Sequence, residues 1–155
     1  MELRPININE NKRNKLYANT DCQQVLAAYE DFYPKIGFHS PWIGYFVING
    51  VEVVGCCGFT GRPKDGKVEI AYQTFKQFEG KGIASFSCKE LISISKKTDH
   101  AVIVTAKTSP ERNASTRILE KNGFVFSKVV RDEEIGDAWL WILGPEKTAG
   151  IEPGT

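Results

Sequence analysis

The sequence predicts a domain built on a mixed α/β sheet, and three observations carry this prediction. Two β-rich runs flank Asn49-Gly50, a dipeptide typical of hairpin turns. In the second half of the chain, helical segments alternate with a short β-branched run, and two further β-rich runs follow. The 155 residues match the usual length of one domain, and no repeat or linker divides them, so we assign residues 1–155 to one domain.

Residues 1–40 predict a short extended segment followed by a helix. Thr20 has the spacing of a capping box with Gln23, which satisfies the first amides of a helix. Pro34 and Gly37 are typical of a helix end. Apolar side chains occur at extended positions and then at helical spacing: Leu3, Ile6 and Ile8, then Val25, Leu26, Tyr29 and Phe32.

Three strands are expected next, at residues 42–48, 51–59 and 67–75. Asn49 and Gly50 tolerate the two positive φ angles of a type I′ turn, so the first two runs form a hairpin. Residues 61–66 contain two glycines and a proline and predict a second turn, which completes a meander of three strands.

A helix is expected at residues 83–97, with Phe86, Leu91, Ile92 and Ile94 as its buried side chains. The β-branched run at 101–106 predicts a buried central strand.

Ser109, Pro110 and Glu111 are typical of an N-cap, a first helical position and a first turn, so a second helix is expected to begin there. It ends at residues 121–122, with Gly123 in the left-handed position. Strands at 124–130 and 138–143 form a terminal hairpin, and residues 145–155 predict a frayed tail.

Composition excludes two classes of protein. The chain has 20 Lys and Arg against 19 Asp and Glu, so it lacks the cationic excess of a sequence-independent nucleic-acid binder. No run reaches the length of a membrane span, and no signal peptide begins the sequence. The four cysteines form no C-x-x-C pair and are interpreted as small buried thiols of a reducing, cytoplasmic protein: Cys22, Cys56, Cys57 and Cys88.

Residues 79–84 (EGKGIA) follow a strand and open a helix. Gly80 and Gly82 let the backbone approach a ligand, and the helix start presents unpaired amides that suit a pyrophosphate. The simpler alternative is a flexible turn between a strand and a helix.

Glu69 lies within a strand in which Val68, Ile70 and Tyr72 alternate with small or polar residues. A carboxylate in an interior strand is costly unless it is paired or functional. We therefore weigh a catalytic role for Glu69 against a salt bridge to a nearby Lys or Arg.

Three patterns together resemble the GNAT superfamily of acyl-CoA-dependent N-acyltransferases, over residues 42–143. The loop 79–84 is similar to the family's [Gln/Arg]-x-x-Gly-x-[Gly/Ala] signature, and residues 110–124 (PERNASTRILEKNGF) are similar to its P-E-N-x-A-S-x-R-x-L-E-K-x-G-F pattern. The strand VEIAY at 68–72 resembles the branch that acetylates the N-termini of ribosomal proteins. Residues 1–40 are then the variable N-terminal part.

The resemblance implies a mostly antiparallel sheet with helices on both faces, splayed between the strands of Glu69 and of residues 102–105. Acetyl-CoA, the implied cosubstrate, enters that splay. The backbone of Tyr72 and Thr74 pairs with the pantetheine, and the Tyr72 amide holds the thioester oxygen. The cofactor-binding residues implied in this way are Tyr72, Thr74, Glu79, Gly80, Lys81, Gly82, Ile83, Ala84 and Asn113.

The implied reaction is acetyl transfer to a primary amine. Glu69 is the candidate base. Ser115 is a candidate hydrogen-bond donor to the departing sulfur or, alternatively, a solvated helix serine. Trp42 is interpreted as a core or rim aromatic, and Trp42 and Tyr45 are also candidates to line the acceptor site.

The sequence also differs from the family pattern at several positions. Glu79 stands where Gln or Arg is usual, Arg112 stands at the family's Asn with Asn113 one place later, and Leu119 replaces a Tyr that many relatives carry.

Two other classes of function stay open: a CoA-binding regulatory or scaffold module without catalysis, and an interaction domain without a cofactor. The sequence identifies neither the acceptor amine nor an oligomeric state.

Overall fold

The computed structural model describes residues 1–145, and the predicted tail at 145–155 lies outside these residues except for Pro145. The elements follow the predicted order along the chain. Their bounds are β1 (Glu2–Pro5), η1 (Lys15–Tyr17), α1 (Thr20–Ile36), β2 (Gly44–Asn49), β3 (Glu52–Phe59), β4 (Lys67–Thr74), η2 (Lys76–Phe78), α2 (Ile83–Thr98), β5 (Ile103–Thr108), α3 (Ala114–Lys121), β6 (Phe124–Asp132) and β7 (Gly136–Leu143).

All strands belong to one open sheet in the order β1-β2-β3-β4-β5-β7-β6. β4 and β5 run parallel, and every other neighbouring pair is antiparallel. The parallel pair requires a crossover, which α2 supplies over one face of the sheet. The predicted mixed, mostly antiparallel fold is therefore confirmed.

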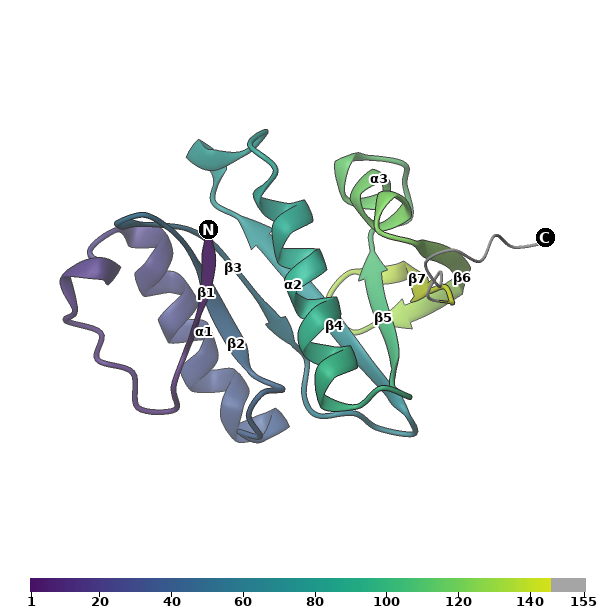
Figure 1. The fold of residues 1–155 in the computed structure, drawn as a ribbon, viewed down its shortest axis with the longest axis horizontal. Helices are drawn as coiled ribbons and strands as arrows, with labels where there is room; N and C mark the ends of the chain where they lie inside the picture. Colours follow the sequence, from purple (N-terminus) through teal and green to yellow (C-terminus); the bar gives the residue numbers. More distant parts are fainter. Residues whose placement is uncertain (146–155) are drawn as a thin grey trace.

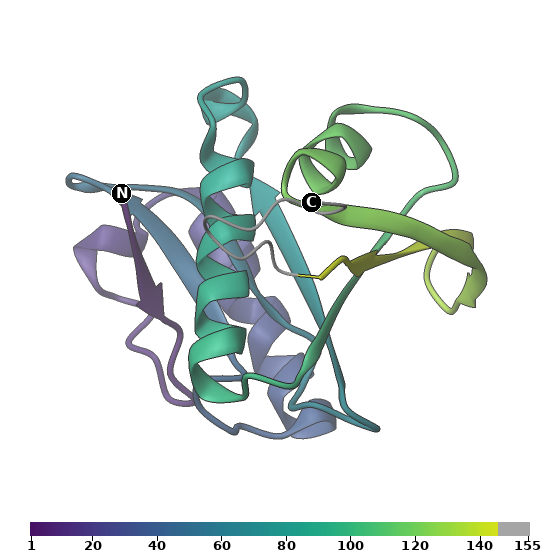
Figure 2. The ribbon, with the colours of Figure 1, turned by 45° about the vertical axis from the view of Figure 1, so that its right-hand side comes forward.

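Helices cover both faces of the sheet (Figure 1). α2 lies across one face and α1 across the opposite face, and Figure 2 shows the same order of layers from the side. α3 packs beside α2 and against β6. Side chains of β2, β3 and β4 form much of the core between the layers, with Phe46, Phe59 and Ile70 each at most 2% exposed.

The β2–β3 hairpin is confirmed, but its turn is displaced by one residue. Asn49 pairs with Glu52, so Gly50 and Val51 are the central residues. Gly50 has φ +66°, and Asn49 is not among the described residues with positive φ. Glycine at the first central position fits a type II′ turn rather than the predicted type I′ turn.

The first helix begins and ends differently from the prediction. Asn19, not Thr20, is the N-cap: its side chain accepts a hydrogen bond from the Cys22 amide at 2.7 Å. Pro34 lies within the helix, which continues to Ile36 and ends where the Gly37 amide donates to the Tyr33 carbonyl at 2.8 Å. A proline this close to the helix end removes a single hydrogen bond, so the last turn survives.

The third helix begins at Ala114, so the predicted start at 109–111 is wrong. Asn113 and Thr116 form a reciprocal capping box: the Thr116 amide donates to Asn113 Oδ1 at 3.2 Å and the Asn113 amide donates to Thr116 Oγ1 at 3.0 Å. Two satisfied amides favour this start over one that begins at Pro110.

The buried face of α2 also differs in part from the prediction. Leu91 is buried as expected, whereas Phe86, Ile92 and Ile94 are half-buried. The other buried residues of α2 are Ile83, Ser87, Cys88 and Ser95. Ser87 and Ser95 each donate to the carbonyl four residues earlier, so small satisfied hydroxyls allow the helix to lie close to the sheet.

Candidate active site

The sheet opens between its two parallel strands. β4 and β5 are paired from Lys67 and Ile103 to Ile70 and Ala106, and then they diverge. Figure 2 shows the two strands separating toward the end of the sheet that carries α3. Beyond Ile70, β4 pairs only with β3, so one edge of its second half has no strand partner among residues 1–145.

The peptide groups that face this opening can be identified from the hydrogen bonds on the other side of β4. Toward β3, the Glu69 carbonyl accepts from Thr60 N at 3.0 Å and the Phe75 amide donates to Val54 O at 3.0 Å. Since peptide groups alternate sides along a strand, odd-numbered residues from 69 to 75 bond to β3. The peptide groups of Tyr72 and Thr74 therefore point into the opening, the place that the family resemblance implies for the pantetheine.

A cavity of about 260 Å³ occupies the opening. It is lined by two of the predicted site residues, Tyr72 of β4 and Ser115 of α3. Leu119, which stands where the family pattern often has a Tyr, lines it as well. Leu119 is 1% exposed and gives this wall an apolar surface without a proton donor. Burial raises the pKa of the Tyr72 phenol, so the hydroxyl stays protonated at neutral pH.

The glycine loop precedes α2 at the same end of the sheet. Gly80 and Gly82 have φ of +80° and +79°, in the left-handed region that favours glycine. Gly82 is the N-cap of α2, and no side chain caps the helix. The first amides of this 16-residue helix therefore lack a partner within the helix and carry the positive end of its dipole.

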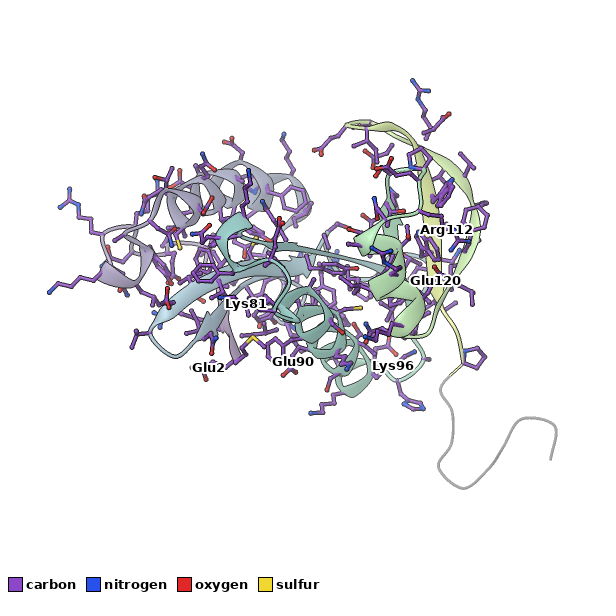
Figure 3. The ribbon with its side chains drawn as sticks, turned by 90° about the horizontal axis from the view of Figure 1, so that it is seen from above. Glu2, Lys81, Glu90, Lys96, Arg112 and Glu120 are labelled. Carbon is purple, nitrogen blue, oxygen red and sulfur yellow. The ribbon has the colours of Figure 1, made fainter. Side chains whose placement is uncertain are left out.

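The loop side chains are exposed, apart from those that enter the helix. Lys81 extends beside the start of α2, with its Nζ 5.8 Å from the centre of the Phe78 ring (Figure 3). Glu79 is exposed at the edge of the loop, Ile83 is buried under it and Ala84 is half-buried. The loop thus offers amides and one cation to a ligand, with one carboxylate beside them.

Glu69 lies on the opposite face of β4 from Val68 and Ile70, which are buried toward α2. Its Oε1 is 3.3 Å from Lys107 Nζ, and the same ammonium is 3.5 Å from Asp132 Oδ2. Glu69 therefore makes a salt bridge to a lysine, as was considered for it. Burial by itself would lower the pKa of Lys107, but the two carboxylates outweigh it and raise that pKa.

Lys107 and Asp132 were not predicted, although they fix the position of Glu69. Glu69 of β4 is opposite Thr105 in the strand register with β5. Lys107 lies two residues after Thr105, on the same face of the sheet. Asp132 ends β6, two strands away in the sheet. Only the strand order brings these three charges together, so no local pattern in the sequence could have revealed them.

Three predicted site residues do not line the cavity at the opening. Trp42 is buried in the core, edge-on to Phe59 with ring centres 5.0 Å apart. Tyr45 is also buried, and its hydroxyl donates to the Pro41 carbonyl at 2.6 Å. Both are therefore core residues, and contrary to the expectation for the acceptor site neither lines a described cavity near Glu69. The Asn113 side chain caps α3.

The cysteines of the described residues are free, and three of the four are buried. Burial raises the pKa of the Cys56 thiol to about 12, so it is protonated at neutral pH and a poor nucleophile. Within residues 1–145 no three acidic, histidine or cysteine side chains gather as metal ligands would. No helix in this part of the chain is both long and apolar enough to cross a membrane.

Comparison with known proteins identifies the family. Residues 7–125 match the model of the acetyltransferase (GNAT) domain. The chain is 32% identical to a Bacillus licheniformis protein, "uncharacterized N-acetyltransferase p20", over 105 residues that cover 64% of this chain and 59% of that protein. The match thus spans less than two thirds of that relative's length.

Solved structures share the fold at low identity. The ribosomal L7/L12 α-N-protein acetyltransferase RimL, in complex with coenzyme A, superposes with a TM-score of 0.64 at 16% identity, over 90% of this chain and 91% of that one. The ribosomal-protein-S5-alanine acetyltransferase of Vibrio fischeri gives a TM-score of 0.60 at 17% identity, over 86% and 76% of the two chains. With the splayed sheet, the glycine loop and a family match over most of its length, this chain belongs to the GNAT acetyltransferase family.

Proposed function

We propose that the protein transfers an acetyl group from acetyl-CoA to a primary amine, of a small molecule or a protein N-terminus, by direct attack on the thioester. One observation carries this proposal. The unpartnered peptide groups of Tyr72 and Thr74 face the same opening that the uncapped start of α2 adjoins. A strand edge suits the amide-containing pantetheine, and a helix start suits the diphosphate of the same molecule.

The cofactor half of the site is built from backbone groups. The pantetheine amides add to the free edge of β4 as a further strand would. The amides of Gly80, Lys81, Gly82 and Ala84 hold the diphosphate, and Asn113 contributes from the start of α3. The left-handed φ angles of Gly80 and Gly82, with no side chain over the loop, support a close approach by the ligand.

The attacking amine must be neutral, because only the neutral form has a free lone pair. Free alkylamines have a pKa near that of lysine, about 10.4, so the amine is protonated at neutral pH and must lose a proton. Glu69 takes the proton of the attacking amine, directly or through one water. The amine nitrogen attacks the thioester carbonyl carbon, and the Tyr72 amide stabilises the oxyanion that forms there. The C–S bond breaks as this oxyanion collapses, and Ser115 donates a hydrogen bond to the departing thiolate.

Two measurements test the proposal. Calorimetry with acetyl-CoA must show binding, and release of the free CoA thiol must then depend on an added amine from a panel of candidates. Binding without thiol release would favour the CoA-binding module that lacks catalysis. Absence of binding would favour an interaction domain and contradict the proposal.

We also propose a cytoplasmic setting for the domain. Its free, buried thiols support this proposal, because such thiols are typical of a reducing compartment. Fractionation of the cells that express the protein would test it.

A further inference from the structure

A second, larger cavity lies on the α1 face of the sheet, beside Glu69. Its volume is about 750 Å³, and it is formed by the end of α1, the turn between β3 and β4, and the start of β4. Four cationic side chains are among its lining residues: Lys35, Arg62, Lys64 and Lys67. Glu69 is the single carboxylate in the lining.

The four cations of this cavity have no ion-pair partner among the residues that the structure describes. Among the ion pairs of residues 1–145, none involves any of the four cations, whereas Glu69 is paired with Lys107. Asp65 belongs to the same turn but does not line the cavity. Four cations against one paired carboxylate leave a local positive potential, although the net charge of the chain is only +1.

The turn that carries Arg62 and Lys64 and leads into Lys67 is held by its own backbone. Lys64 N donates to Lys67 O at 2.8 Å, and Lys67 N donates to Lys64 O at 3.1 Å. The positions of the two lysine backbones relative to β4 are therefore fixed. A turn fixed in this way binds an anion with less loss of backbone entropy than a flexible loop would.

The cations and the reaction centre lie in order along one face of β4. Lys67, Glu69 and Ala71 share this face, and neighbours on it are about 7 Å apart. Glu69 lines the cationic cavity, whereas Ala71 and Lys107 line the cavity at the opening between the strands. An amine positioned at Glu69 thus has the thioester on one side and the cations on the other.

We propose that the acceptor is an amine that also carries a carboxylate or a phosphate, bound by Arg62, Lys64 and Lys67 while its amino group faces Glu69. This inference rests on the proposed acetyl transfer and specifies the class of acceptor. Both a small metabolite and an N-terminus followed by acidic residues contain the required chemistry.

Matched pairs of amines test the charge requirement. β-Alanine is compared with its amide, phosphoethanolamine with ethanolamine, and a short peptide acidic at its second and third positions with its Asn/Gln counterpart. We expect kcat/KM of the anionic member to exceed that of the neutral member by about tenfold or more in at least one pair, with a ratio that falls as salt is added. The pair that responds distinguishes a metabolite from a peptide.

Charge-removing variants test the site itself. Arg62→Gln and Lys64→Gln should each lower the ratio of anionic to neutral kcat/KM by about three- to tenfold, as expected for one partly solvated charge near an anion. Arg13→Gln removes the same charge from an exposed N-terminal position outside the cavity and is the matched control. Equal ratios for all three variants and the wild type would overturn the proposal.

A binding measurement separates this inference from the proposed activity. Titration of the protein with N-acetyl-β-alanine should shift the NMR signals of Arg62 and Lys64, whereas the amide analogue should not. Anion binding without any acetylation would contradict the activity but support the cavity's ligand class. Acetylation with equal preference for neutral and anionic amines, and no anion-dependent shifts, would contradict the ligand class alone.

Discussion

Gly82→Val tests the glycine loop, because the structure separates two effects of the substitution. Gly82 has φ +79°, which a β-branched residue adopts at a cost of about 1–3 kcal/mol. A Cβ at this position meets nothing within 4 Å, so steric conflict within the protein adds nothing. The Tm should fall by about 2–4 °C per kcal/mol, and the protein should stay folded.

A further loss is expected when acetyl-CoA binds. The valine side chain occupies the space through which the diphosphate approaches the amides at the start of α2. We expect the Kd to rise by at least about 100-fold, equivalent to about 2.7 kcal/mol. Calorimetric titration with acetyl-CoA at 15 °C, below the unfolding transition, measures it.

Gly136→Val is the matched control. Gly136 has φ +78°, also with nothing within 4 Å of an added Cβ, but it lies in the β6–β7 hairpin. Both variants should therefore lose similar stability, while only Gly82→Val loses affinity. Wild-type affinity in Gly82→Val, or equal losses in both variants, would refute the assignment of the diphosphate to this loop.

Three further predictions concern charged residues. Glu69→Gln should lower kcat/KM by about 10²–10⁴ if Glu69 is the general base, with little change in acetyl-CoA affinity, and unchanged activity across pH 6–9 would restrict Glu69 to its salt bridge. Glu79→Gln, and more so Glu79→Arg, should tighten acetyl-CoA binding by about two- to fivefold, with a gain that shrinks at high salt; weaker binding by both would show that Glu79 makes a needed contact. Asp132→Asn should lower the Tm at pH 7, because the amides of Glu134 and Ile135 and then Lys107 hold the pKa of Asp132 below its ordinary value of 3.8. That stability is present above pH 3.8 and is lost as the pH falls through the lowered folded-state pKa, so the two melting curves should converge in acid; a constant difference would contradict this origin.

Local patterns in the sequence determined most elements of the fold. Periodicity and turn residues depend on neighbours within a few positions, so the order of strands and helices and the β2–β3 hairpin could be predicted. The loop at 79–84 was also predictable, since two glycines before a helix are a local signal. Errors occurred where two local signals competed, as at the start of α3, where the Asn113 capping box prevailed over Ser109-Pro110.

The tertiary structure alone decided which charges meet. Glu69, Lys107 and Asp132 lie on three strands whose adjacency follows from sheet order and register, and neither is encoded within a short window of sequence. In the cationic cavity, likewise, Lys35 at the end of α1 lies beside Arg62 and Lys64, which belong to a turn nearly thirty residues later in the chain. The proposed cofactor site, built from the backbone of neighbouring residues, was thus indicated by the sequence through its glycine loop and its family resemblance. The proposed acceptor site, built from side chains on separate elements, required the fold.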